Sequence, residues 1–255
     1  MLAKLKLYIS SGDFEITYHI SSLLHGAMMS IIKPEYAEFL HSGGLNPFSI
    51  NLKKDTNGWC WTVATVGKEP YENIIKPLLD ESFIEFTLIH KNNALVKIDK
   101  KILYTESVDK LFSGCITSNT SNNIKLEFSA PTAFKSKGEL VTYPDLHLIY
   151  HSLMKKAQLI SSDISFDDNE TLKALENNSK IVAYSLKTVV HHVEGRRITG
   201  FVGYIIIQIN GPAILRNFAE TLFEIGSYLG VGMKASLGMG AINLIKTKEV
   251  EPVEW

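Results

Sequence analysis

The sequence predicts an α+β protein made of two tandem ferredoxin-like domains. Two observations support this. Strand-like and helical runs follow one another in the order β-α-β-β-α-β, which is the ferredoxin-like arrangement. After the polar stretch 113–123 a similar order begins again. Since 255 residues are enough for two domains of ordinary size, we expect an N-terminal domain over residues 1–120 and a C-terminal domain over 121–255.

In the first half, Leu2–Ile9 alternates apolar and polar residues with the period of a strand. Apolar residues between Ile20 and Ile32 recur at helical spacing, and Glu35–Leu40 continues as a short helix after Pro34. Residues 53–58 form a polar run that predicts a turn. Further strands are expected at Phe48–Leu52, Trp59–Val66, Phe83–His90 and Leu95–Tyr104, with a helix at Tyr71–Leu79.

The second half repeats the pattern. The polar segment 161–178 has room for a short helix. Strands are expected at Ile124–Phe128, Ile181–His191, Thr199–Ile209 and Ala241–Ile245, and helices at Pro144–Met154 and Ala213–Leu229.

The composition is that of a soluble globular protein, with 45% hydrophobic and 21% charged residues. The formal net charge of −1 gives no overall basic field, which disfavours nonspecific coating of nucleic acid. Lysines and arginines do occur in small clusters, such as Lys53-Lys54, Lys155-Lys156 and Arg196-Arg197. Most of these should be solvated surface, although together they allow a basic face on the folded protein.

Cys60 and Cys115 are the two cysteines, and neither lies at the spacing of a zinc site. We therefore expect no disulfide framework, no metal and no cofactor, as in a protein of the reducing cytoplasm. The N-terminus lacks the apolar core of a signal peptide, and no apolar run reaches membrane-spanning length.

The stretch Gly230–Gly240 is the most distinctive part of the chain. Its glycine pairs Gly230/Gly232 and Gly238/Gly240 flank Lys234 and Ser236, and it lies between the last predicted helix and strand. Successive glycines can form a concave nest of N–H groups for anionic oxygens, to which Lys234 would add a charge. The alternative is a helix-to-strand turn that begins with a C-cap at Gly230. Neither a Walker loop nor a dinucleotide fingerprint fits the order and spacing.

Together with the preceding Ser-Tyr-Leu, this loop resembles the glycine-rich signature of the CRISPR-associated repeat-cleaving endoribonucleases, the sixth Cas family. The agreement extends to both halves of the chain. Within the family, the sequence most resembles the enzymes that serve type III systems. The other matching stretches are Leu24–Met29 followed by His41, Phe128–Phe134 followed by Tyr143-Pro-Asp145, and Thr199–Gly203.

The resemblance implies a metal-independent cut in the repeat of a precursor CRISPR RNA. In such a cut the RNA's own 2′-hydroxyl attacks the adjacent phosphate and leaves a 2′,3′-cyclic phosphate and a 5′-hydroxyl. Proton transfer near neutral pH suits histidine, and His41 matches the family's catalytic histidine. Met29 stands where some members have a tyrosine, and Asn46 falls near a position that some fill with lysine.

The resemblance also assigns RNA binding to Gly230, Gly232, Lys234, Ser236, Gly238 and Gly240. From the residues themselves, Lys53, Lys54 and the paired Arg196 and Arg197 of a predicted hairpin turn are further RNA-binding candidates. Lys53 or Lys54 could also stand in for the family lysine. Beyond the RNA, a CRISPR effector complex and a second copy of the chain are candidate partners.

Several other histidines have structural explanations that involve no catalysis. His25 fits packing within its helix, His19 has no obvious partner, and His191-His192 fits surface at a strand edge. Two other functions stay open. One is a non-catalytic RNA-binding subunit of a CRISPR ribonucleoprotein, which the missing tyrosine favours. The other is a small-molecule enzyme whose glycine loop holds a phosphorylated ligand.

Overall fold

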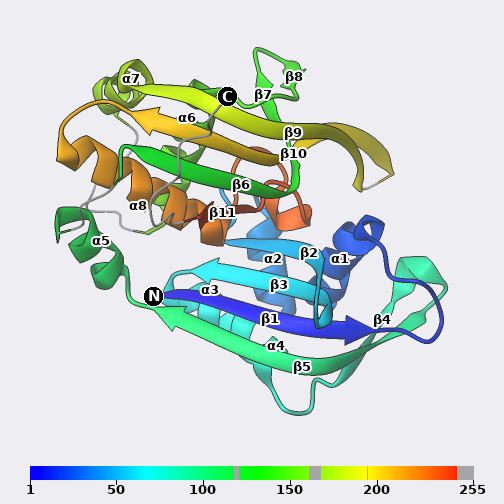
Figure 1. The fold of residues 1–255 in the computed structure, drawn as a ribbon. Coiled ribbons are helices and arrows are strands. Elements are labelled where there is room, and N and C mark those ends of the chain that lie inside the picture. Colours follow the sequence, from blue (N-terminus) through cyan, green and yellow to red (C-terminus); the bar gives the residue numbers. More distant parts are fainter. Residues whose placement is uncertain (118–120, 161–167, 194, 246–255) are drawn as a thin grey trace.

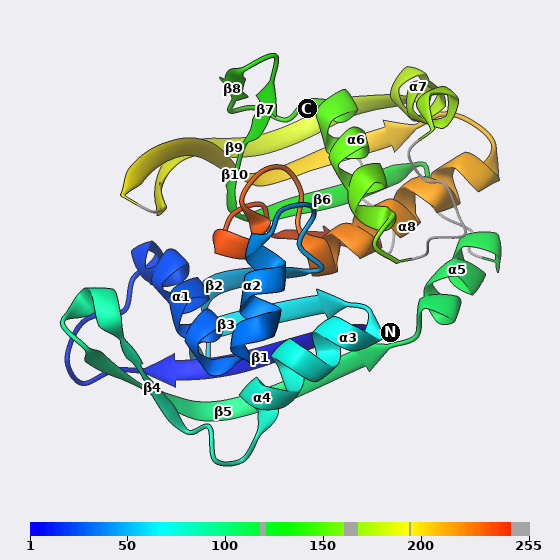
Figure 2. The ribbon, with the colours of Figure 1, turned by 180° about the vertical axis from the view of Figure 1, so that it is seen from behind.

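The computed structural model describes residues 1–117, 121–160, 168–193 and 195–245. Two antiparallel sheets form the frame, one built from each half of the chain (Figure 1). Seen from behind, α1, α2, α4 and α6 lie in front of the sheets, so these helices cover the same side of both (Figure 2). The opposite sheet faces therefore look toward the viewer of Figure 1.

The N-terminal half forms a five-stranded sheet in the order β2-β3-β1-β5-β4. Without the edge strand β4, this is the order of a ferredoxin-like sheet. Its strands are β1 (Leu2–Ser10), β2 (Phe48–Asp55), β3 (Gly58–Val66), β4 (Glu85–Leu88) and β5 (Ala94–Glu106). Its helical elements are η1 (Tyr18–Ile20), α1 (Ser21–Ile31), α2 (Pro34–His41), the run α3 (Lys68–Pro70), η2 (Tyr71–Ile75) and α4 (Lys76–Leu79), and η3 (Ile89–Lys91).

The C-terminal half forms a four-stranded sheet in the order β11-β6-β10-β9, again that of a ferredoxin-like unit. Its strands are β6 (Asn123–Thr132), β9 (Ser179–Val193), β10 (Arg196–Ile209) and β11 (Ile242–Ile245), beside the small hairpin of β7 (Phe134–Ser136) and β8 (Glu139–Val141). Its helices are α5 (Val108–Thr117), α6 (Leu146–Ala157), α7 (Asn169–Asn178), α8 (Ala213–Leu229) and the 3-10 turn η4 (Ala235–Leu237).

The predicted fold class is confirmed, but one predicted turn is too long and one hairpin was not predicted. The polar run 53–58 is not all turn, because β2 continues to Asp55 and pairs with β3 as far as Gly58. The Asp55 side chain accepts a hydrogen bond from the backbone N–H of Asn57, which closes a tight turn at 2.7 Å. The hairpin β7–β8 was not predicted at all.

Helix α5 runs through the first part of the polar boundary stretch 113–123, as far as Thr117. Leu111 of that helix is buried in the C-terminal core, so an apolar face holds the helix despite its polar residues. Residues 118–120 of the stretch lie outside the described part of the chain, as do residues 161–167 of the segment 161–178. The rest of that segment contains α7, which Asp168 caps.

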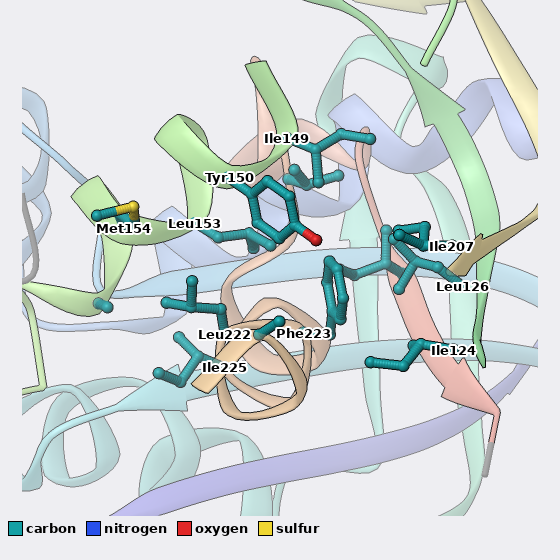
Figure 3. Close-up of a cluster of buried hydrophobic side chains, with 14 of the residues drawn as sticks. Ile124, Leu126, Ile149, Tyr150, Leu153, Met154, Ile207, Leu222, Phe223 and Ile225 are labelled. Atoms are coloured by element: carbon teal, nitrogen blue, oxygen red, sulfur yellow. The ribbon is translucent and has the colours of Figure 1, made fainter. Parts of the chain in front are cut away.

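The C-terminal core lies between α6, α8 and the sheet (Figure 3). Tyr150 of α6 and Phe223 of α8 are fully buried and face each other with ring centroids 5.7 Å apart. Leu2 and Val66, from the N-terminal sheet, belong to the same buried cluster. Burial of such side chains is worth about 1.5–3 kcal/mol each, so the shared core ties the two sheets together.

A polar contact supports this junction. The hydroxyl of Ser49 on β2 donates to the carbonyl of Tyr228 on α8 at 2.6 Å. The ammonium of Lys4 lies over the Tyr228 ring, 4.7 Å from its centroid. The two halves are thus held in one arrangement, which fixes the loops that meet between them. Among the described residues, no helix is long and apolar enough to span a membrane.

Candidate nucleic-acid interface

The glycine-rich loop begins where α8 ends. Gly230, at φ +66°, closes the helix as its N–H donates to the carbonyl of Gly226 at 2.7 Å, which confirms the predicted C-cap. The loop then turns back on itself, since the N–H of Val231 donates to the carbonyl of Gly240 at 2.7 Å. The N–H of Gly240 donates in turn to Pro131 at 2.9 Å, which anchors the loop to β6.

Close packing explains why glycines recur in this loop. A Cβ at Gly240 would stand 2.0 Å from the carbonyl oxygen of Val231, and one at Gly232 would stand 2.4 Å from that of Ala133. A Cβ at Gly238 would stand 2.5 Å from the side chain of Ser21 on α1. All three glycines also have positive φ, which side chains rarely adopt. The glycines therefore shape the loop, and Lys234 and Ser236 are its half-buried polar side chains.

Ser236 joins the glycine-rich loop to the loop that follows α2. The side-chain amide of Asn46 donates to the Ser236 hydroxyl at 3.2 Å, across 190 residues of sequence. The turn η4 packs against β2 and α1 at the same place. Lys234 is held at φ +54° in the left-handed region, and its carbonyl accepts the N–H groups of Leu237 and Met239. The fold thus brings the glycine-rich loop into contact with the loop that follows His41.

His41 lies at the C-terminal end of α2, directly before the loop that contains Asn46, and its side chain is exposed. Its ring is 6.4 Å from that of His25 on α1, and the two planes are almost perpendicular. His25 stacks on Phe48 with its centroid 6.0 Å away, so the predicted packing role of His25 agrees with the structure. His41 thus presents an exposed imidazole five positions before Asn46, whose side chain contacts the glycine-rich loop.

Met29 does not replace the family tyrosine chemically. Its thioether packs against the N-terminal core, and a thioether donates no hydrogen bond. Asn46, near the position of the family lysine, supplies an amide that is already bonded to Ser236. Polar side chains on the two joined loops and at the end of α2 include those of His41, Asn46, Ser236 and Lys234.

Lys53 and Lys54 lie at the other end of β2. Phe48 and Lys53 are five positions apart along the strand, or about 16 Å, so neither lysine fits the role of a catalytic stand-in beside His41. The Lys53 ammonium is 3.8 Å from Glu127 on β6, and that of Lys54 lies over the Trp59 ring. Both line a groove of about 670 Å³ between β2, η1 and the open face of β9 and β10. Its other polar and aromatic lining residues include Tyr18, His19, Lys187 and Tyr204.

Arg196 and Arg197 are exposed at the start of β10, beside the turn of the β9–β10 hairpin. Arg196 pairs with Val193, and Arg197 pairs with His192, so both lie within the strand rather than in the turn itself. His192 is exposed as predicted, and its ring lies 4.8 Å from that of His19. Both arginines therefore lie at the turn end of the β9–β10 hairpin, opposite the end where β9 begins at Ser179.

Two buried residues were misjudged from the sequence. Lys156 was expected at the surface but is 8% exposed, and its ammonium is held by backbone carbonyls at the end of α8. His191 was expected at a strand edge but is 2% exposed. Burial lowers its pKa, although a hydrogen bond to the backbone of Leu237 opposes this, and the neighbouring His19 and His192 lower it further. Both residues contact the glycine-rich loop, Lys156 through the carbonyls of Gly230 and Gly232 and His191 through the backbone of Leu237.

Cys60 is buried and unbridged, while the side chain of Cys115 lies outside the described part of the structure. Within the described ranges, no group of three or more His, Cys, Asp or Glu side chains is arranged to hold a metal ion.

Comparison with solved structures identifies the fold class. A Cas6 product complex superposes with a TM-score of 0.79 at 20% identity, covering 96% of this chain and 99% of that one. Thermus thermophilus Cas6 superposes with a TM-score of 0.72 at 18% identity, covering 96% and 98%. The chain therefore has the tandem ferredoxin-like fold of these Cas6 structures.

Sequence comparison finds relatives of the same kind. The model for "CRISPR-associated endoribonuclease Cas6" matches residues 126–242. The Cas6 endoribonuclease of Streptococcus thermophilus is 28% identical over 225 residues, or 88% of this chain and 91% of the relative. That of Mycobacterium tuberculosis is 28% identical over 222 residues, covering 87% of this chain and 70% of the relative. These relatives are CRISPR-associated Cas6 endoribonucleases, and the chain is similar to them over most of its length.

Proposed function

We propose that this chain is an endoribonuclease that cuts precursor CRISPR RNA within its repeats. The observation that carries the proposal is the hydrogen bond between Asn46 and Ser236, which joins the loop that follows the exposed His41 to the glycine-rich loop. Similarity to Cas6 proteins supplies the substrate class, since the related proteins are named as CRISPR-associated endoribonucleases.

In the proposed reaction the RNA cuts itself, and the protein positions it and moves protons. The 2′-hydroxyl loses its proton and attacks the adjacent phosphorus, while the bond to the 5′-oxygen of the next nucleotide breaks. That oxygen leaves with a proton, so the products are a 2′,3′-cyclic phosphate and a 5′-hydroxyl, with no redox change. No step in this scheme needs a metal ion.

His41 is the proposed proton-transfer residue. Histidine is the side-chain type best suited to taking and returning protons near neutral pH. Lys234 is proposed to balance the extra negative charge on the phosphate, and the Ser236 hydroxyl to donate to a phosphate oxygen. With Met29 in the place of a tyrosine, these two residues would carry the stabilisation that a phenol provides elsewhere.

The proposed path of the RNA extends from this site along the lysine-lined groove. Lys53, Lys54 and Lys187 would pair with phosphates, while Tyr18 and Tyr204 offer rings on which bases can stack. Arg196 and Arg197 would hold a more distant part of the strand. The length of this surface favours a polymeric ligand over the small phosphorylated molecule of the alternative reading.

The remaining assignments are proposals from the sequence and from the family resemblance. We propose two domains that divide near residue 120 of the chain, with α5 before that point packing on the C-terminal core. We also propose action in the cytoplasm, service to a type III system, and a CRISPR effector complex and a second copy of the chain as further partners. The rival function is RNA binding without cleavage, which Met29 favours and the exposed His41 opposes.

Cleavage of a labelled CRISPR repeat RNA in EDTA tests the proposal. His41→Ala should slow cleavage by roughly 10²–10⁴-fold with little loss of RNA affinity, as expected for removal of a general acid–base residue. The matched control is His90→Ala, since His90 is also exposed but lies on η3, between β4 and β5. Equal cleavage by the wild type and His41→Ala would remove His41 from the reaction. Tight binding without cleavage by the wild type would support the non-catalytic rival.

A further inference from the structure

Lys156 is a buried cation beneath the glycine-rich loop. Its ammonium donates to the carbonyls of Leu229 at 3.0 Å, Gly230 at 3.0 Å and Gly232 at 3.4 Å. An ammonium has three N–H donors, so these three acceptors match its full capacity. The carbonyls span the last residue of α8 and the first turn of the loop. Lys156 therefore joins the helix end to the loop.

Burying the Lys156 ammonium costs desolvation free energy, which its hydrogen bonds must offset. A buried charge is normally tolerated only when it is paired or fully hydrogen-bonded. The described residues include no ion pair to Lys156, and burial alone lowers its pKa, to about 7. The partial negative charge at the C-terminal end of α8 is what favours the cation there. A methionine or leucine would fill the same space without that cost.

A second residue of α6 holds the same loop turn. The hydroxyl of Ser152 accepts the N–H of Gly232 at 2.9 Å. Ser152 and Lys156 are four residues apart and so lie on one face of the helix. Between them they bond the N–H and the carbonyl of Gly232, while the next N–H, that of Met233, donates to Ala133 at 3.0 Å. The backbone is thus fixed up to the residue before Lys234.

We propose that Lys156 is a positioning residue for RNA binding, which holds the first turn of the glycine-rich loop so that Lys234 and Ser236 face the RNA. Lys156 is buried and does not touch the RNA. It acts through the loop, and through the bond between Ser236 and Asn46 it also fixes the loop next to His41. The inference rests on the proposed function, because it concerns how the same site binds its substrate.

The test is a binding measurement with a repeat RNA that carries a 2′-deoxy nucleotide at the cut, so that no cleavage intervenes. Lys156→Met removes the ammonium and keeps most of the volume. We expect the Kd to rise by about tenfold or more, as for loss of a charged hydrogen-bonding group. The matched control is Leu153→Ala on the same helix. Leu153 is fully buried, so its truncation destabilises the fold without touching the carbonyls.

A double-mutant cycle separates positioning from general stability. If Lys156 acts through Lys234, the double variant Lys156→Met/Lys234→Ala should bind no more weakly than the weaker single variant. Independent effects would instead multiply, to about a hundredfold for two tenfold losses. All variants are compared at a temperature where circular dichroism shows them folded.

The outcomes are distinct. Multiplied effects, or a Lys156→Met variant that binds like the wild type, would overturn the inference and leave the proposed function standing. A Leu153→Ala variant that loses as much affinity as Lys156→Met would also overturn it. Failure of the wild type to bind the RNA would overturn both. If Lys156→Met does not fold, Ser152→Ala takes its place in the cycle, and effects that multiply with Lys234→Ala would then refute the positioning role.

Discussion

Gly240→Ala should disrupt the glycine-rich loop, and the structure gives the size of the effect. Gly240 has φ +69°, where a side chain costs roughly 1–2 kcal/mol. The new Cβ would stand 2.0 Å from the carbonyl oxygen of Val231, which is closer than any real contact. Relieving that overlap must move the two strands of the loop apart and break the bond from Val231 to Gly240, for about 1 kcal/mol more.

The free energy of unfolding should therefore fall by about 3 kcal/mol, which for a chain of this size lowers Tm by roughly 6–12 °C. Gly138→Ala is the matched control, because Gly138 has φ +88° in the β7–β8 turn and an added Cβ there meets nothing within 4 Å. We expect the free energy of unfolding of the control to fall only by the cost of a side chain at positive φ, roughly 1–2 kcal/mol. Thermal unfolding and RNA affinity of both variants would be measured. Equal losses of Tm in the two variants would refute the close-packing explanation of the loop glycines.

Three further predictions concern the site. Lys234→Ala should weaken RNA binding and reduce the slope of log Kd against log salt by about 0.7, as for one lost contact to single-stranded RNA, and an unchanged slope would exclude a phosphate contact. Asn46→Ala should lower the cleavage rate of bound RNA more than the affinity, because it frees the loop next to His41; single-turnover rates at saturating enzyme measure this, and a loss confined to affinity would contradict it. Burial lowers the pKa of His191 in the folded chain, so the unfolded state binds more protons as the pH falls below about 6.5 and stability is lost there. Urea titrations at pH 7.5 and 5.5 should therefore show a larger loss for the wild type than for His191→Gln, and parallel losses would refute the assignment.

Much of the fold could be predicted because its elements have regular patterns. The alternation in β1 and the helical spacing in α8 each reflect one buried face, so periodicity located both. The pattern failed where polar residues dominate a real element. Helix α5 carries serine, glycine and threonine in its second half, and its burial through Leu111 depends on a core built from distant strands.

The site could be predicted only in part, because sequence does not show which face a side chain occupies. Lys155 and Lys156 are neighbours, yet the first is exposed and the second is buried under the loop, since adjacent helix positions point about 100° apart. His191 and His192 lie on opposite faces of a strand for a similar reason. The bond from Asn46 to Ser236 depends on how the two sheets meet, and no local pattern specifies that.

The most direct test of the central claim is the fate of one 2′-hydroxyl. Wild-type protein would be incubated in EDTA with a repeat RNA and with the same RNA carrying a single 2′-deoxy nucleotide at the cut. We predict that the normal RNA yields a 2′,3′-cyclic phosphate and a 5′-hydroxyl, and that the 2′-deoxy RNA is bound equally well but stays intact. Cleavage of the 2′-deoxy RNA at the same position would contradict attack by the RNA's own hydroxyl, and with it the role given to His41.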